Sequence, residues 1–146
     1  YPNNVNWEFS KNKNKSIKVV NDQIGAPTGA ELIADVTALC LYQITQYKNS
    51  AHNLSGTYHL TPTGKTSWHG FAQFIIAELA GMGVEFRANF ENIVPISTSE
   101  FPLPAKRPAN SLLETKIICR TFNLKLPQWQ FHAQRLLKEL FSQQAI

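Results

Sequence analysis

Residues Val19–Asp35 read VVNDQIGAPTGAELIAD, and their order predicts a short strand that passes through a turn into a helix. The β-branched residues favour the strand, while a glycine and a proline prevent either element from continuing through the turn. Thr28, followed three residues later by Glu31, matches a capping box, in which two side chains satisfy free backbone amides at a helix start. The pattern therefore predicts a helix that starts at Thr28 and a polar pair, Asp22 and Gln23, at the carboxyl end of the strand.

The position of this polar pair indicates a ligand site. In open α/β sheets, loops at the carboxyl ends of strands line the crevice where ligands bind, and an exposed helix N-terminus attracts anionic groups. The same pattern also fits an ordinary strand–turn–helix joint, because capping boxes are common. Spacing alone leaves both interpretations open and names no ligand.

Length and composition limit the class of protein. The chain has 146 residues, of which 43% are hydrophobic, and this predicts one core and a single domain or a large part of one. The formal net charge of +4 is small and comes in part from a lysine cluster in the first 18 residues. Since no nucleic-acid-binding motif accompanies it, we expect no nucleic-acid partner. No apolar run reaches the length of a membrane span, so we also expect no membrane partner.

The two cysteines, Cys40 and Cys119, each fall in an apolar helical pattern. We interpret them as reduced core thiols, although a single disulfide stays open. No signal-peptide pattern begins the chain, and the expected location is the cytoplasm. Because the first residue is Tyr1 and not Met, a targeting segment that once preceded it also stays open.

Apolar periodicity predicts the arrangement of the elements. Helices are expected over residues 29–47, 67–80, from Ser111 or Glu114 to Phe122, and from Pro127 onward, and Thr66 or Ser67 is expected to cap the second of them. Three of these helices have an apolar face that is expected to pack inward, and these faces include Leu32, Ile33, Val36, Leu39 and Ile44 on the first, Trp68 on the second, and Trp129, Leu136, Leu137 and Leu140 on the last. Strands are expected over residues 17–21, 56–60 and 93–96, the last confined to an edge or an end by Pro95. Residues 1–16 are polar and fit either a frayed lead-in or a short edge strand. The sequence therefore predicts an α/β fold with helices packed on a small sheet.

A proline-rich loop, residues 97–113, carries the adjacent cations Lys106 and Arg107. A rigid loop lowers the ordering cost of binding, and a guanidinium group can hold a phosphate with two parallel hydrogen bonds. A solvated basic loop explains the same residues equally well. His59 and His69 have no cysteine, histidine or carboxylate at ligand spacing, so no metal site is expected.

Four motifs along the chain carry a resemblance to a known family. They are Val20–Thr28 (VNDQIGAPT), Gly56–Leu60 (GTYHL), Arg107–Leu113 (RPANSLL) and Leu126–Gln130 (LPQWQ). Their order and spacing resemble the C-terminal half of the dTDP-4-dehydrorhamnose reductases. The resemblance implies that residues 17–146 form the sugar-nucleotide-binding region of a Rossmann-type extended short-chain dehydrogenase, with a small, incomplete sheet and packed helices. Residues 1–16 match poorly.

The resemblance also implies an activity. Members of the family use NADPH or NADH to reduce the 4-keto group of dTDP-6-deoxy-L-lyxo-4-hexulose to dTDP-L-rhamnose, which serves cell-surface polysaccharide. This chain departs from the pattern because it has neither the Gly-rich dinucleotide fingerprint nor the Tyr-x-x-x-Lys pair on which hydride transfer depends. We expect both upstream of Tyr1, in an N-terminal Rossmann half that binds the cofactor. The chain by itself is therefore expected to be inactive, with no catalytic residue of its own.

Within this chain the resemblance implies substrate binding. Asp22, Gln23 and Thr28 are expected beside the sugar-nucleotide crevice, and Arg107 is expected toward the pyrophosphate of the dTDP-sugar. The expected partners are this substrate and the Rossmann half, while a homodimer stays open. A binding role without catalysis also stays open, because the regulatory subunit of methionine adenosyltransferase resembles the same reductases.

The predicted helices also lead to an expectation about the surface. Strands of the Rossmann half would cover some of their apolar side chains. The chain by itself is therefore expected to expose an apolar patch and to associate.

Overall fold

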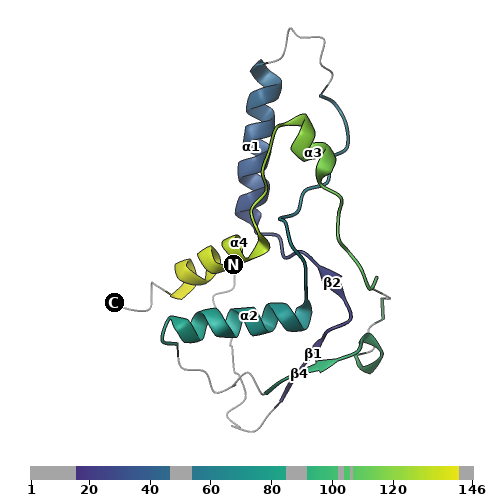
Figure 1. The fold of residues 1–146 in the computed structure, drawn as a ribbon, viewed down its shortest axis with the longest axis vertical. Coiled ribbons are helices and arrows are strands. Elements are labelled where there is room, and N and C mark those ends of the chain that lie inside the picture. Colours follow the sequence, from purple (N-terminus) through teal and green to yellow (C-terminus); the bar gives the residue numbers. More distant parts are fainter. Residues whose placement is uncertain (1–15, 47–53, 85–91, 102–103, 106, 142–146) are drawn as a thin grey trace.

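The computed structural model describes residues 16–46, 54–84, 92–101, 104, 105 and 107–141. In chain order the elements are β1 (Ile17–Val20), β2 (Ile24–Gly25), α1 (Ala30–Gln46), β3 (Thr66–Ser67), α2 (Trp68–Gly81), β4 (Ile93–Ile96), the 3₁₀ helix η2 (Thr98–Glu100), α3 (Lys116–Thr121) and α4 (Trp129–Phe141). In Figure 1, α1 follows the long axis of the molecule, α2 lies across it, and the β1–β4 pair lies at the far end. The predicted α/β class is confirmed. Residues 1–15 of the predicted lead-in, Tyr47 and Lys106 lie outside the described residues.

The strands form two small sheets instead of one. β1 pairs with β4 in parallel, with Ile17 opposite Ile93 and Val20 opposite Ile96. β2 pairs with β3 in antiparallel register. In the described part of the chain β4 has β1 as its only neighbour, so Pro95, which has no amide hydrogen to donate, can stand on its open edge. The predicted strands at 17–21 and 93–96 are confirmed.

The predicted strand at residues 56–60 is wrong. These residues have no strand partner. The ring of Tyr58 packs edge-on against Phe122, with centroids 5.1 Å apart, and its hydroxyl donates to the Leu54 carbonyl at 2.8 Å. Strand-like composition here reflects burial of Tyr58 and Leu60 against a helical core, because β propensity mostly measures how a side chain packs.

Two groups of apolar side chains hold the helices in place. The first joins α1 to α3 and centres on buried Leu32, Val36, Ile118 and Phe122. The second joins α2 to α4, where the Trp129 ring lies edge-on to Phe71 and Phe74, with centroids 5.7 and 4.8 Å apart. α2 also contacts β1, β3 and β4, so the second group lies on the side of the molecule that holds the strands (Figure 1).

The two long helices begin differently. Of the two caps predicted for α2, Thr66 and Ser67, the structure has Ser67, whose hydroxyl accepts from the amide of Gly70 at 2.9 Å. The predicted capping box of α1 is wrong. The Thr28 hydroxyl donates to the Ala26 carbonyl at 2.9 Å instead of accepting from the amide of Glu31, and the helix begins at Ala30. This local turn holds Thr28 outside the helix.

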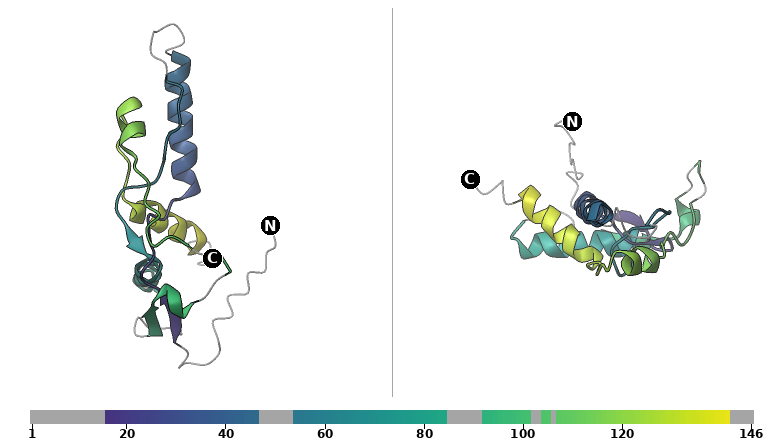
Figure 2. Two further views of the ribbon diagram at one scale, coloured as in Figure 1. Left: turned by 90° about the vertical axis from the view of Figure 1, so that its right-hand side faces the viewer. Right: turned by 90° about the horizontal axis from the view of Figure 1, so that it is seen from above.

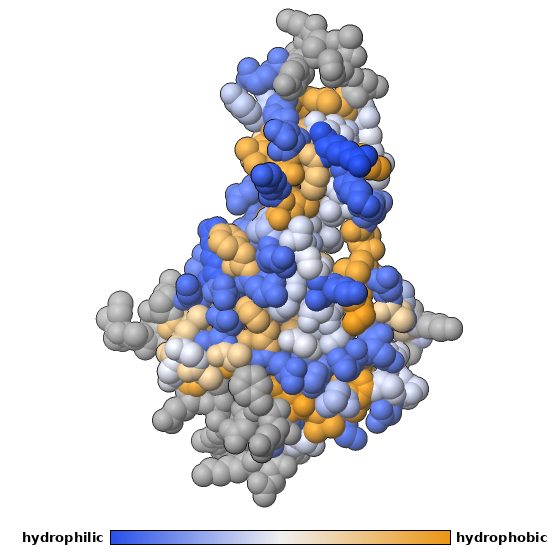
Figure 3. All heavy atoms as spheres, viewed as in Figure 1, coloured by the Kyte–Doolittle hydropathy of each residue, from blue (hydrophilic) through white to orange (hydrophobic). Residues whose placement is uncertain are grey.

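The predicted apolar faces are only partly buried. On α1, Leu32 and Val36 are buried, whereas Ile33, Leu39 and Ile44 are exposed. On α4, Trp129 and Leu137 are buried, but Leu136 and Leu140, which were expected to face inward, are exposed. Figure 2 shows α1 as a column that rises away from α2, and Figure 3 shows apolar patches interspersed with polar side chains in the upper part of the molecule. None of the helices among the described residues has the length and apolar character of a membrane span.

Candidate functional site

Three segments that are distant in the sequence meet just beyond the end of β1. β2 lies at their centre. On one side Ile24 pairs with Ser67 of β3. On the other side, the Ile24 amide donates to the Ala109 carbonyl at 2.8 Å, and its carbonyl accepts from the Ser111 amide at 2.9 Å. The loop that contains Arg107 is therefore held against the strand-end loop by backbone hydrogen bonds.

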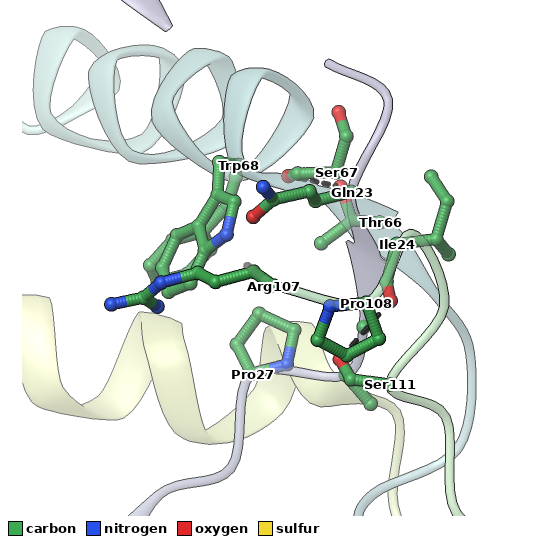
Figure 4. Close-up of a pocket in the computed structure, with 12 residues that line it drawn as sticks. Gln23, Ile24, Pro27, Thr66, Ser67, Trp68, Arg107, Pro108 and Ser111 are labelled. Atoms are coloured by element: carbon green, nitrogen blue, oxygen red, sulfur yellow. Dashed lines mark hydrogen bonds between the residues drawn. The ribbon is translucent and has the colours of Figure 1, made fainter. Parts of the chain in front are cut away.

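These segments enclose an open pocket of about 290 Å³, which Figure 4 shows at close range. Its walls come from residues 23–27, 66–68, 71, 107, 108 and 111. A second hollow of about 310 Å³ shares Gln23, Trp68 and Arg107 with the first and adds Lys18 and Phe101. The three shared side chains thus separate two neighbouring hollows at one end of the molecule.

Two glycines of the pocket region face a hydroxyl group at short distance. A Cβ atom at Gly25 would lie 2.9 Å from the Ser111 hydroxyl oxygen, and one at Gly70 would lie 2.5 Å from the Thr66 hydroxyl oxygen. A side chain at Gly25 would therefore require the Ser111 hydroxyl to move from its present position, where it donates to the Ile24 carbonyl at 3.1 Å. The glycine of the VNDQIGAPT motif thus leaves room for this hydrogen bond between β2 and the loop that contains Arg107.

The charge that lines the pocket is positive. Arg107 is the charged residue among the side chains of the first hollow, and Lys18 joins it in the second, while neither hollow is lined by a described acidic residue. Within the described residues the ion pairs are Lys116–Glu114 and Arg135–Glu139, so Arg107 belongs to none. Its guanidinium group is available to an anionic ligand.

Gln23 and Asp22 are neighbours that face different ways. Gln23 is buried, and Figure 4 shows its carboxamide directed toward Trp68. The exposed Asp22 carboxylate instead turns to η2, where it accepts from the Thr98 hydroxyl at 2.6 Å and from the Thr98 amide at 2.9 Å. The hydroxyl bond, and then the amide bond, hold the pKa of Asp22 below its ordinary value, so this side chain is a carboxylate at neutral pH.

The structure brings two of the four predicted site residues into the pocket. Gln23 and Arg107 line it, whereas Asp22 and the exposed Thr28 lie beside it, next to lining residues. The predicted contacts of all four residues with a ligand stay predictions.

Trp68 corrects the sequence interpretation, which placed it on the core face of α2. The side chain is 53% exposed and lines both hollows. Helical side chains lean toward the N-terminus, so an aromatic residue directly after the cap Ser67 extends past the helix end. That position was the signal that could have identified Trp68 as a site residue.

His59 and His69, the two histidines considered in the sequence analysis, take no part in the pocket. His69 is buried with its Nε2 3.2 Å from the Ile93 carbonyl oxygen, which ties α2 to β4, and His59 is exposed. Neither lines a described hollow. No group of three histidine, cysteine or carboxylate side chains that could hold a metal ion is present among the described residues.

A cationic pocket at the carboxyl ends of strands, with an aromatic wall and few polar groups, is an arrangement typical of α/β proteins that bind anionic organic ligands. The chain belongs to the family described as the RmlD substrate binding domain, whose family model matches residues 6–142. The resemblance inferred from the four motifs is thereby confirmed.

Individual relatives share one name. The chain is 40% identical over 129 residues to the dTDP-4-dehydrorhamnose reductase of Burkholderia thailandensis, a match that covers 88% of this chain and 43% of that protein. The Escherichia coli K12 protein of the same name is 40% identical over 132 residues, which is 90% of this chain and 42% of that one. The chain thus spans about two fifths of the length of these curated relatives.

A solved structure shows the same partial match. The Bacillus anthracis dTDP-4-dehydrorhamnose reductase, crystallised in complex with NADP, superimposes with a TM-score of 0.63 at 31% identity. The match covers 86% of this chain and 38% of that protein. This agreement extends the family assignment from the sequence to the fold.

Proposed function

We propose that this chain is the C-terminal, substrate-binding part of a dTDP-4-dehydrorhamnose reductase. The complete enzyme would reduce the 4-keto group of dTDP-6-deoxy-L-lyxo-4-hexulose with NADPH or NADH and form dTDP-L-rhamnose for cell-surface polysaccharide. One observation carries the proposal: two of the motifs that resemble the family, Val20–Thr28 and Arg107–Leu113, meet to build a single cationic pocket. The names of the relatives support the same conclusion.

The proposed role of the pocket is to hold the dTDP-sugar. The pyrophosphate carries two negative charges, and the unpaired Arg107 offers a planar fork of donors to them. Trp68 provides an apolar wall for a base or sugar ring, and Gln23 provides a polar group that can fix its orientation. In this proposal Asp22 and Thr28 shape the loop around the substrate.

The described residues do not form a dinucleotide cradle of their own. The glycines of the site, Gly25 and Gly70, face the hydroxyl groups of Ser111 and Thr66, and the sequence has no Gly-rich dinucleotide fingerprint. We therefore assign the cofactor and the catalytic Tyr-x-x-x-Lys pair to an N-terminal Rossmann half, and assign no catalytic residue to this chain.

The cellular setting belongs to the same proposal. We assign the enzyme to the cytoplasm, which is supported by the unpaired state of Cys40 and Cys119. Its proposed partners are the dTDP-sugar, the Rossmann half and a second copy of the enzyme. The regulatory role typical of the methionine adenosyltransferase subunit is not favoured, because the relatives found are named as reductases.

The test is turnover by the full-length protein. We expect oxidation of NADPH, followed by its absorbance, when dTDP-6-deoxy-L-lyxo-4-hexulose is added, and no oxidation with the chain of residues 1–146 alone. Calorimetry should detect dTDP binding to the full-length protein. A full-length protein with an intact Tyr-x-x-x-Lys pair that binds neither dTDP nor the ketosugar would overturn the proposal.

A further inference from the structure

A chain of hydrogen bonds connects Asp22 to the pocket through η2. The Thr98 hydroxyl lies 2.6 Å from Oδ1 of Asp22 and 3.1 Å from Nε2 of Gln23. The Thr98 amide also donates to the Asp22 carboxylate at 2.9 Å. Thr98 therefore stands between a residue outside the pocket and a buried residue that lines it.

The number of available protons determines the direction of each bond. A carboxylate has no hydrogen to donate, so the single hydroxyl hydrogen of Thr98 must point to Asp22. The same hydroxyl can then only accept from Gln23, and its partner must be the nitrogen of the carboxamide. The reverse orientation would place the Gln23 oxygen against a lone pair of the hydroxyl and would leave two acceptors facing each other.

We propose that Asp22 is a positioning residue which, through Thr98, keeps the carboxamide oxygen of Gln23 turned into the pocket as a hydrogen-bond acceptor. Figure 4 shows the Gln23 oxygen on the side of the carboxamide that faces Arg107 and the nitrogen on the opposite side. Asp22 thus acts on a ligand without lining the pocket.

This orientation specifies the chemistry of the ligand. The group that meets Gln23 must be a donor, an O–H or an N–H, while the group that meets Arg107 must be an anion. The proposed sugar nucleotide offers both, either as a sugar hydroxyl or as the N–H of its pyrimidine, and this identification rests on the proposed function. The orientation of Gln23 itself does not.

Two substitutions test the relay in the full-length enzyme. Thr98→Val removes the hydroxyl. Asp22→Asn supplies a side-chain amide that can donate to the Thr98 hydroxyl oxygen. The hydroxyl hydrogen of Thr98 can then point to Gln23, whose carboxamide would rotate so that its oxygen accepts this hydrogen. Both should raise KM for the dTDP-sugar about three- to tenfold, with kcat little changed, since one hydrogen bond is lost from substrate and transition state alike. Thr98→Ser keeps the hydroxyl and should keep the wild-type KM.

Glu100→Gln is the matched control. Glu100 lies on the same 3₁₀ turn and accepts from the Ser97 amide at 2.9 Å, but it does not contact Gln23. If Asp22 served only to hold the turn, Glu100→Gln and Asp22→Asn would raise KM equally, and this result would overturn the proposal. Titration with dTDP alone and with the dTDP-sugar separates the two donors: a loss seen with both assigns the pyrimidine N–H, and a loss confined to the dTDP-sugar assigns a sugar hydroxyl.

The orientation of Gln23 can be measured without any ligand. In nitrogen-15-labelled full-length protein, the side-chain amide of Gln23, assigned by its disappearance in Gln23→Leu, should show one proton that exchanges slowly with solvent. Thr98→Val and Asp22→Asn should abolish this protection, and Glu100→Gln should preserve it. Unchanged protection in Thr98→Val would overturn the relay even if turnover were normal. Protection that behaves as expected in a protein without turnover would instead count against the proposed function alone.

Discussion

The strand-end loops and α1 use their side chains in opposite ways. In the loops, polar groups pair within the chain: Asp22 accepts from Thr98, and the Ser67 hydroxyl donates to the side-chain oxygen of Asn21 at 2.6 Å. On α1, the large side chains of Leu41 and Tyr42 are 58% and 64% exposed. The loops complete their own contacts, whereas α1 presents a face that the described residues leave uncovered.

Because of this difference, we expect ligand binding and folding stability to depend on different regions of the molecule. The geometry of the pocket depends on local hydrogen bonds and close backbone approach, which the chain supplies itself. The stability of α1 depends on one buried edge, packed against α3, and an exposed apolar surface adds nothing to stability until something covers it. Substitutions in the two regions should therefore affect different measurements.

The largest effect is expected from Phe122→Ala, which removes the ring that joins α1 to α3. Phe122 is 2% exposed and packs against Tyr58, so the free energy of unfolding should fall by about 3–5 kcal/mol. Chemical denaturation of the wild type and the variant measures this loss. Phe131→Ala, at a ring that is 57% exposed, is the control and should cost less than about 1 kcal/mol. Equal losses of unfolding free energy in the two variants would contradict the expected role of Phe122 in joining α1 to α3.

Arg107→Ala should weaken substrate binding at the pocket. We expect KM of the full-length enzyme for the dTDP-sugar to rise, with a loss of about 2–4 kcal/mol in transition-state stabilisation and little change in NADPH affinity. Arg107→Lys should recover only part of this lost stabilisation, because an ammonium group cannot form the bidentate contact. Arg120→Ala, at an exposed cation on α3 outside the pocket, is the control.

An alternative role for Arg107 is to tie its loop to the C-terminal helix. In that case Arg107→Ala would lower Tm and leave KM unchanged. Measurement of Tm and KM on the same variant distinguishes the two roles, and an unchanged KM with a lowered Tm would contradict the phosphate contact.

Substitution on the open face of α1 should change association much more than stability. The chain of residues 1–146 should bind an apolar dye and associate with rising concentration, and Leu41→Lys combined with Tyr42→Lys should reduce both. The free energy of unfolding should change by no more than about 0.5 kcal/mol. Thr37→Lys, at an exposed polar position of the same helix, should leave dye binding unchanged. A wild-type chain that is a monodisperse monomer without dye binding would contradict this expectation.

The smallest expected effect is a dependence of Tm on pH. Thr98 lowers the pKa of Asp22 from the ordinary value of 3.8, so the stability that Asp22 contributes is present above that value and is lost as the pH falls through the lower pKa of the folded state. Asp22→Asn cannot titrate, and its Tm deficit relative to wild type should shrink below about pH 4. Glu100 also titrates in this range, and the charge of Asp22 raises its pKa only in the wild type, so the same comparison is made in a Glu100→Gln background. A deficit that is constant with pH would rule out the contribution of Asp22.

The sequence by itself determined the family and most of the elements. Strong periodicity predicted the bodies of α1, α2 and α4, and residue type limited the cap of α2 to Thr66 or Ser67, because these features depend on neighbours within one turn of a helix. The motifs around Gln23 and Arg107 indicated the pocket because polar residues at strand ends and a cation on a stiff loop are local features.

Only the tertiary structure decided how these residues face one another. The Tyr58 segment pairs with no strand because a helical core buries it, and Trp68 reaches the pocket because it stands at the end of α2. Asp22 and Thr98 are 76 residues apart in the sequence, so no local pattern could show that the carboxylate turns to η2. Hydrogen bonds and burial depend on distances in space, which nearest-neighbour patterns do not contain.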